Sequence, residues 1–182
     1  MIIQTILKYA SIDELNMIES EEELLEYLRQ HEIPYQRIEH PPVFTCDEAE
    51  RYRPRFSSVS TKNLFLEDKH GNPFLLMTDC EKRTNLKALG AQIGAIKLHL
   101  ASEARLWELL GVNRGAVTVL GLINDIQNQV RLLVDEDIWE REYFLCHPMV
   151  NTATLIMAKK DLEYYFMLSG HNVNLVAIPI MR

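Results

Sequence analysis

Three polar segments of this sequence carry groups that could act on a substrate, and each stands where an apolar run meets a loop. Lys62 and Asn63 open the apolar run of "STKNLFL", and His147 begins "HPMVNTAT". Gly115 lies in "GVNRGAVTVLGL", where the lack of a side chain lets backbone N–H groups approach a ligand closely. A fixed cation, hydrogen-bonding side chains and backbone donors indicate a pocket that works through positioned polar groups.

Each of these features also has a purely structural interpretation. A lysine at a strand end commonly lays its carbon chain over apolar neighbours while its ammonium stays in water. A single histidine before a proline belongs to an extended segment and is usually structural or solvated. Glycines most often make turns. None of the three spacings is diagnostic by itself, so both interpretations stay open at this point.

The motifs of the common covalent and metal-dependent enzymes are absent from the sequence. There is no G-x-x-x-x-G-K-[ST] phosphate loop and no G-x-G-x-x-G dinucleotide motif. There is no G-x-S-x-G nucleophile elbow, and neither H-E-x-x-H nor a close His/Cys set offers a metal site. We therefore expect neither a metal nor an organic cofactor.

Length and composition are those of a soluble, one-domain protein. The chain has 182 residues, and its 19 basic and 26 acidic residues give a net charge of −7. This balance argues against broad, non-specific binding of nucleic acid but allows a local basic patch. No apolar run approaches the roughly 20 residues of a membrane span, and the first residues lack the basic leader of a secretion signal. We expect a cytoplasmic monomer without membrane contact.

The three cysteines give no pattern of their own. Cys46, Cys80 and Cys146 are far apart and odd in number, and no C-x-x-C pair occurs. A cytosolic setting disfavours disulfides. We therefore expect three reduced thiols, buried or half-buried, and no structural zinc site.

Local signals predict helices at several places along the chain. Ser20 with Glu23 forms an S-x-x-E capping box that predicts a helix after residue 20. Thr45 begins a second capping box, "TCDE", which predicts a short helix through Tyr52. Apolar periodicity closed by a glycine predicts further helices over residues 85–94, 102–111 and 159–170.

Several of the expected strands form hairpins. Residues 61–68 and 73–79 flank the turn "KHGN", and residues 116–125 and 129–137 flank a turn near Asn128. Shorter strands are expected over residues 33–40, 96–100, 142–147, 152–158 and 172–178. Hairpins mixed with helices favour an α+β fold: a single compact domain with a mixed, largely antiparallel sheet and flanking helices.

Taken in order, four strings of this sequence resemble a known family. They are "EHPPVFTCDEA", "STKNLFLEDKHGNPFLLM", "LGVNRGAVTVLGLIND" and "CHPMVNTATLIM". They are similar to segments of the YbaK/ProX-type aminoacyl-tRNA editing domains, and most similar to the freestanding prolyl-tRNA editing proteins called ProX or PrdX. The likeness spans residues 20–178, so we expect an N-terminal extension over residues 1–19 and an editing domain over residues 20–182.

The resemblance implies hydrolysis, in trans and without a cofactor, of the ester that joins a wrong amino acid to tRNA. The expected substrate is alanine on proline tRNA, Ala-tRNA(Pro), and the alternative within the class is Cys-tRNA(Pro). The implied partners are the acceptor end of mischarged tRNA(Pro) and prolyl-tRNA synthetase. The family's G-x-x-x-P loop has Val119 here in place of its proline. This departure keeps open a non-catalytic module that binds tRNA or the synthetase.

Carried onto this sequence, the resemblance assigns catalytic roles to Lys62, Asn63 and His147. Lys62 would be a fixed charge for a phosphate or the polarised ester, while Asn63 and His147 would position substrate and water. Backbone N–H groups near Gly115 would stabilise the oxyanion. The residues expected to bind substrate are Thr45, Gly115, Thr118 and Asn151.

Two further sets of residues are candidates with an equally plain structural alternative. One set could line a pocket that admits alanine and excludes proline by size, or simply pack in the core: Phe44, Cys46 and Leu64. The other could contact the acceptor end of the tRNA or form a solvated face: Lys82, Arg83, Lys87 and Lys97.

Overall fold

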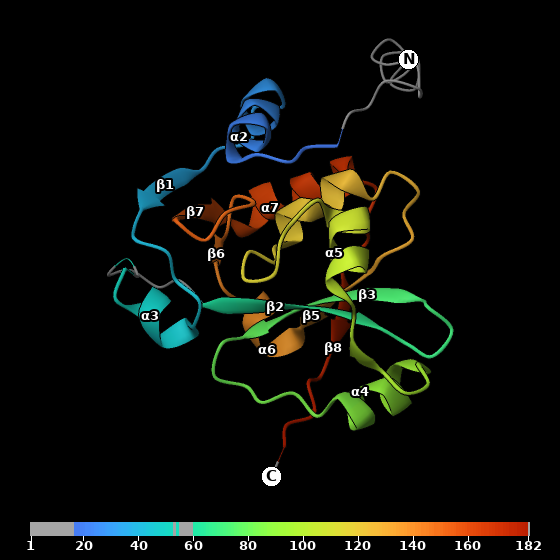
Figure 1. Ribbon diagram of the computed structural model, residues 1–182. Coiled ribbons are helices and arrows are strands. Elements are labelled where there is room, and N and C mark those ends of the chain that lie inside the picture. The colour runs from blue at the N-terminus through green and yellow to red at the C-terminus, as the bar shows by residue number, and fades with distance from the viewer. Residues whose placement is uncertain (1–16, 53, 55–59, 182) are drawn as a thin grey trace.

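A computed structural model describes residues 17–52, 54 and 60–181 (Figure 1). Its helices are α2 (Glu21–Gln30), α3 (Cys46–Glu50), α4 (Leu86–Ile93), α5 (Glu103–Leu110), the 3-10 helix η1 (Val119–Asn124), α6 (Glu136–Trp139) and α7 (Lys159–Leu168). Its strands are β1 (Gln36–Glu39), β2 (Thr61–Glu67), β3 (Pro73–Asp79), β4 (His99–Leu100), β5 (Arg131–Asp135), β6 (Tyr143–Cys146), β7 (Ala153–Ala158) and β8 (Asn174–Val176).

The strands form two sheets with mixed pairing. The larger sheet has the order β4-β2-β3-β5-β8, and the smaller one has the order β1-β7-β6. The β2–β3 hairpin is antiparallel, as are both pairs of the smaller sheet, whereas β5 runs parallel to β3 and to β8. The predicted α+β fold with mixed, largely antiparallel pairing is confirmed, and its strands divide between two sheets.

Helix ends follow the predicted capping chemistry. The Ser20 hydroxyl accepts from the Glu23 amide at the start of α2, and the Glu23 carboxylate accepts from the Ser20 amide. At the other end of a helix, Gly94 and Gly111 take left-handed conformations directly after α4 and α5. These local signals fix where the helices begin and end because each satisfies backbone groups that the helix itself leaves unpaired.

The larger sheet separates two hydrophobic clusters. Side chains alternate along β3, so Leu75 and Met77 pack against one cluster while Phe74 and Leu76 pack against the other. The first cluster includes residues of α2, α5 and α7 and of the smaller sheet, and the second includes Leu89 of α4. Figure 1 shows α5 and α7 on one side of β2 and β3, and α4 on the other. The position of each residue in β2 therefore decides which of the two clusters its side chain faces.

The predicted second hairpin is wrong, because its first half is not a strand. Residues 119–124 form η1, and β5 pairs in parallel with β3 instead of folding back on them. Short, fully buried apolar runs look alike in strands and in buried helices, so periodicity could not separate the two. Gly121 lets η1 approach α5 closely: a Cβ there would lie 2.9 Å from the Leu110 carbonyl oxygen.

The expectation of three reduced thiols is also wrong. Cys46 and Cys80 form a disulfide, and their Cα atoms are 5.9 Å apart although 34 positions separate them in the sequence. Cys46 opens α3 and Cys80 directly follows β3, so the tertiary fold brings together two residues that show no spacing motif. Only Cys146 is a buried free thiol, as expected.

The predicted boundary after residue 19 stays a prediction. Residues 1–16 lie outside the described residues, while Ile18 is tied to the domain: its amide donates to Asn124 Oδ1 and its carbonyl accepts from Asn124 Nδ2, both at 2.8 Å.

In the described part of the chain, no helix is both long and apolar enough to cross a membrane. Within the same ranges, no cluster of three or more His, Cys, Asp or Glu side chains could hold a metal.

Candidate active site

His147 lines a small pocket at the ends of several strands. The pocket has a volume of about 40 Å³ and is enclosed by α3, the start of β2, and the ends of β3 and β6. Its lining residues are Ala49, Tyr52, Ser60, Thr61, Cys80, Leu145, His147 and Thr154. Strand ends that converge from both sheets thus supply a rigid frame around one imidazole.

The His147 imidazole is uncharged at neutral pH. Burial, with a smaller contribution from the nearby His40, lowers the pKa of His147 to about 4. A neutral ring has one donor nitrogen and one acceptor nitrogen, so it can orient a water or a hydroxyl group without carrying charge.

His40 is a site residue that our sequence analysis missed. Its Nδ1 donates to the Pro41 carbonyl oxygen at 2.9 Å, and its Nε2 lies 2.9 Å from the Thr154 hydroxyl. The ring stacks on Tyr52 with centroids 5.1 Å apart. The available signal was a second His-Pro dipeptide, "HPP", matching the one at His147. His40 therefore supports two lining residues of the pocket.

Lys62 lies on the other face of β2 from Asn63. Its neighbours Leu64 and Leu66 pack toward α4, and its ammonium donates to the Cys80 carbonyl at 2.9 Å and to the Lys82 carbonyl. Burial lowers the pKa of Lys62, an effect that Asp79 opposes. Two of the three ammonium donors are thus used within the protein. Lys62 is linked to the pocket by its hydrogen bond to the carbonyl of Cys80, which lines the pocket.

Asn63 faces the opposite cluster and joins β2 to the glycine-containing loop. Its Nδ2 donates to the Val117 carbonyl at 3.3 Å. Its Oδ1 is buried and has no hydrogen-bond partner among the described residues. A buried acceptor without a partner costs roughly 1–3 kcal/mol, so such atoms are rare unless a ligand or water completes them.

Gly115 and Thr118 shape the loop that Asn63 holds. Gly115 has φ +93°, and a Cβ there would lie 3.6 Å from the Phe44 ring. Phe44 is 73% exposed, so an aromatic ring covers the glycine from the solvent side. The fully buried Thr118 hydroxyl accepts from the Leu120 amide and begins η1. Thr118 is therefore occupied in fixing the loop end.

Thr45 and Asn151 build the neighbouring segment. Thr45 Oγ1 accepts from the Glu48 amide at 3.2 Å, and the Glu48 carboxylate accepts from the Phe44 amide at 2.7 Å. Asn151 Nδ2 donates to the Val43 carbonyl, and its own carbonyl accepts from the Val43 amide. Both residues hold the chain that carries Phe44 over Gly115, and neither lines the pocket of His147.

Of the remaining predicted residues, some lie at the pocket and others are engaged elsewhere. Leu64 packs in the cluster beside α4, and Cys46 is bonded to Cys80 at the pocket. The Lys82 ammonium lies between two carboxylates, 2.8 Å from Asp135 and 2.5 Å from Asp137. Its charge is therefore largely compensated within the protein.

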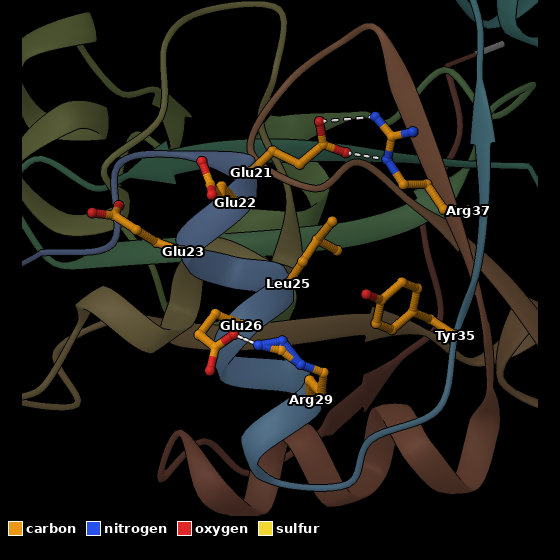
Figure 2. Close-up of a pocket in the computed structure, with 8 residues that line it drawn as sticks. All are labelled: Glu21, Glu22, Glu23, Leu25, Glu26, Arg29, Tyr35 and Arg37. Carbon is orange, nitrogen blue, oxygen red and sulfur yellow. Dashed lines mark hydrogen bonds and ion pairs between the residues drawn. The ribbon is translucent and has the colours of Figure 1, made fainter.

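A larger groove of about 590 Å³ lies elsewhere, between α2 and the chain that enters β1. Figure 2 shows two ion pairs among its charged side chains, Glu21 with Arg37 and Glu26 with Arg29. No residue predicted from the sequence to be functional lines this groove. The smaller pocket is the candidate active site.

Comparison with known proteins decides what kind of domain carries this pocket. Residues 40–165 match the family of aminoacyl-tRNA editing domains. This chain belongs to that family. The match begins at His40 and includes the pocket, the glycine loop and both His-Pro segments, so the resemblance stated from the four strings is confirmed.

Full-length relatives support the same assignment. The chain is 32% identical over 162 residues to the prolyl-tRNA editing protein ProX of Acetoanaerobium sticklandii, covering 88% of this chain and 99% of that protein. It is 37% identical over 156 residues to prolyl-tRNA synthetase associated domain-containing protein 1 of Danio rerio, covering 85% of each.

A solved structure shares the fold of this editing domain. A candidate trans-editing enzyme for prolyl-tRNA synthetase superposes with a TM-score of 0.64, covering 89% of this chain and 99% of the other. The two chains are 17% identical, so this likeness concerns the fold alone.

Proposed function

We propose that this chain is a trans-editing aminoacyl-tRNA deacylase that hydrolyses the ester of mischarged tRNA(Pro), with Ala-tRNA(Pro) as its substrate. The observation that carries the proposal is an uncharged, half-buried imidazole, His147, in a small pocket within an editing domain. The names of the ProX relative and of the synthetase-associated relative support the link to proline tRNA.

An aminoacyl ester is already activated, so the protein needs only to hold it, direct a water and stabilise the oxyanion. A group with a pKa of about 4 is a weak general base at neutral pH, because efficient bases have pKa values near the working pH. His147 therefore orients the attacking water or a ribose hydroxyl by hydrogen bonding.

The remaining roles follow from the placement of each group. Asn63 offers a buried carbonyl oxygen without a partner in the described structure, which can accept from the amino group of the substrate. Backbone N–H groups of the loop at Gly115 stabilise the oxyanion, a contribution whose loss typically costs about 10²–10³ in rate. Lys62 keeps one ammonium donor for the terminal phosphate or the ester oxygen.

We propose that alanine is selected by its size. Proline is larger than alanine, so a closely fitting pocket rejects it through clashes with the walls. Clashes reject larger ligands far more strongly than a missing methyl group rejects smaller ones. The Val119 side chain is fully buried at the start of η1, so the family's loop proline is replaced by a packed residue.

Partners follow from the same proposal. The acceptor end of tRNA(Pro) is the bound part of the substrate, and prolyl-tRNA synthetase is the enzyme whose errors are corrected. Arg83, Lys87 and Lys97 remain as the contact set for the acceptor end, since the Lys82 charge is compensated by Asp135 and Asp137. We place this monomeric activity in the cytoplasm.

A deacylation panel tests the proposal directly. The purified protein should release alanine from Ala-tRNA(Pro) while leaving Pro-tRNA(Pro) intact. Preferential loss of Cys-tRNA(Pro) would assign the alternative substrate, and binding of tRNA without any ester loss would identify a non-catalytic module.

The role of Lys62 is tested within the same panel. Lys62→Ala should lose most of the activity, and full activity in that variant would remove Lys62 from the mechanism. Lys69→Ala is the matched control, because Lys69 is exposed in the turn at the other end of the same hairpin. It should behave as the unmodified protein does.

A further inference from the structure

The Cys46–Cys80 disulfide forms part of the wall of the candidate active site. Cys80 lines the pocket together with His147, and its carbonyl accepts from the Lys62 ammonium. Cys46 is the first residue of α3, and Ala49 of α3 lines the pocket as well. The bond thus ties one wall of the pocket to another.

The disulfide is a covalent restraint on the short helix α3. This helix has five residues, and none of them is buried. Burial of apolar side chains is the main force that holds a helix in place, and α3 gains little of it among the described residues. Its surroundings supply polar and stacking contacts, such as Ser60 Oγ to Glu50 Oε2 at 3.0 Å and His40 against Tyr52. A covalent bond to Cys80 therefore restrains a segment that packing restrains only weakly.

With the disulfide formed, the pocket is small for a ligand site. Its volume of about 40 Å³ is well below the roughly 300–1,000 Å³ of typical ligand pockets. On the solvent side, Phe44, two residues before Cys46, lies against Gly115 of the loop proposed to hold the oxyanion. Movement of α3 would change both the pocket and the cover of this loop.

We propose that Cys46 and Cys80 form a reversible thiol–disulfide modification site that controls access to the pocket. Reduction by a dithiol releases α3 and opens the pocket to the aminoacyl ester, and oxidation by a peroxide closes it. This control rests on the proposed deacylase function, whereas the movement of α3 does not.

The environment of the two sulfurs suits exchange, and that of the third cysteine does not. Cys46 and Cys80 are both half-buried, so the pair lies near the surface and not in the core. Cys146 is 1% exposed, and burial raises its pKa to about 12, which leaves it protonated and unreactive. The modification is therefore confined to one pair.

The chemistry balances in both directions. In reduction, a thiolate of the dithiol attacks one sulfur of the pair, the S–S bond breaks, and a mixed disulfide forms. The second thiol of the reductant then closes its own disulfide, so two electrons and two protons pass to Cys46 and Cys80. In oxidation, a thiolate attacks one oxygen of the peroxide, the O–O bond breaks with loss of hydroxide, and a sulfenic acid forms. The sulfenic acid condenses with the other thiol, which forms the S–S bond and releases water.

The experiment uses the full chain, oxidised with hydrogen peroxide or reduced with dithiothreitol. Alkylation with iodoacetamide under native conditions and mass spectrometry should show two additional modified cysteines in the reduced form, Cys46 and Cys80. Amide hydrogen exchange over residues 44–52 should be faster in that form. Deacylation of the tRNA(Pro) substrate should rise roughly fivefold or more on reduction and fall again on reoxidation.

Two variants separate the pair from other effects of redox reagents. The double variant Cys46→Ser/Cys80→Ser should hold constant activity and constant exchange in both reagents. Cys146→Ala should keep the response of the unmodified protein.

The outcomes that overturn the proposal are distinct from failure of the proposed function. Absence of the disulfide after peroxide treatment, unchanged exchange over residues 44–52, or activity that stays level or falls on reduction would each refute it. A protein that deacylates no tRNA in either state refutes the deacylase function. Alkylation and hydrogen exchange still decide whether the pair opens and releases α3.

Discussion

The half-buried imidazole of His147 leads to a quantitative prediction about stability at acid pH. Its pKa is lowered from the ordinary 6.5 to about 4, chiefly by burial. In the unfolded chain the ring takes up a proton near pH 6.5, while in the folded protein it stays neutral until about pH 4. Below pH 6.5 protonation therefore favours the unfolded state, so stability falls as the pH falls through this window.

The size of the effect follows from the two pKa values. At pH 5, preferential protonation of this ring in the unfolded chain raises the equilibrium constant for unfolding roughly 30-fold, which corresponds to about 2 kcal/mol. At pH 7 the same contribution is only about 0.2 kcal/mol. His147 should thus lower the free energy of unfolding by about 2 kcal/mol between pH 7 and pH 5.

Urea unfolding at pH 7 and pH 5 measures this loss. His147→Gln is the reference, because it removes the titrating ring and leaves every other titrating group in place. Both proteins should be kept in the oxidised state so that the disulfide contributes equally. The loss of stability between the two pH values should be about 2 kcal/mol larger in the unmodified protein. Equal losses in both proteins would refute the assignment of a neutral, desolvated imidazole.

Three further variants test other parts of the structure. Asn63→Ala should lower the kcat/KM of deacylation roughly tenfold or more, as expected for the loss of one hydrogen bond to substrate, and unchanged kinetics would contradict that contact. Gly115→Ala should cost roughly 1–2 kcal/mol in thermal or urea unfolding, because φ +93° disfavours a side chain; equal stability would be inconsistent with that backbone conformation. Tyr165→Phe should cost about 1–3 kcal/mol, because the Tyr165 hydroxyl donates to the Leu120 carbonyl in the core. The exposed neighbour offers the control Tyr164→Phe, whose stability should be nearly unchanged, and equal losses in both tyrosine variants would rule out this bond.

Most helix ends and the central hairpin could be predicted from short strings of sequence. The capping boxes at Ser20 and Thr45 and the glycine after α5 act on backbone groups within four residues, so the signal and its effect lie together in the chain. The β2–β3 hairpin is equally local, since its turn sets the register in which Thr61 meets Asp79.

The predicted site was less complete because its residues were chosen by likeness to a family and not by placement. Lys62 and Asn63 are adjacent in sequence, yet strand alternation sends them to opposite faces of the larger sheet. His40 and His147 lie on different chain segments and interact only after β1 and β6 join the same sheet.

By itself, the sequence determined the family, the α+β class and the positions of most local elements, because those depend on contiguous strings. Tertiary structure alone decided that residues 119–124 form a helix, that Cys46 bonds to Cys80 and that the pocket closes around His147. Each of these depends on packing between segments far apart in the chain. Burial then gives His147 its low pKa, a property that no local pattern of residues encodes.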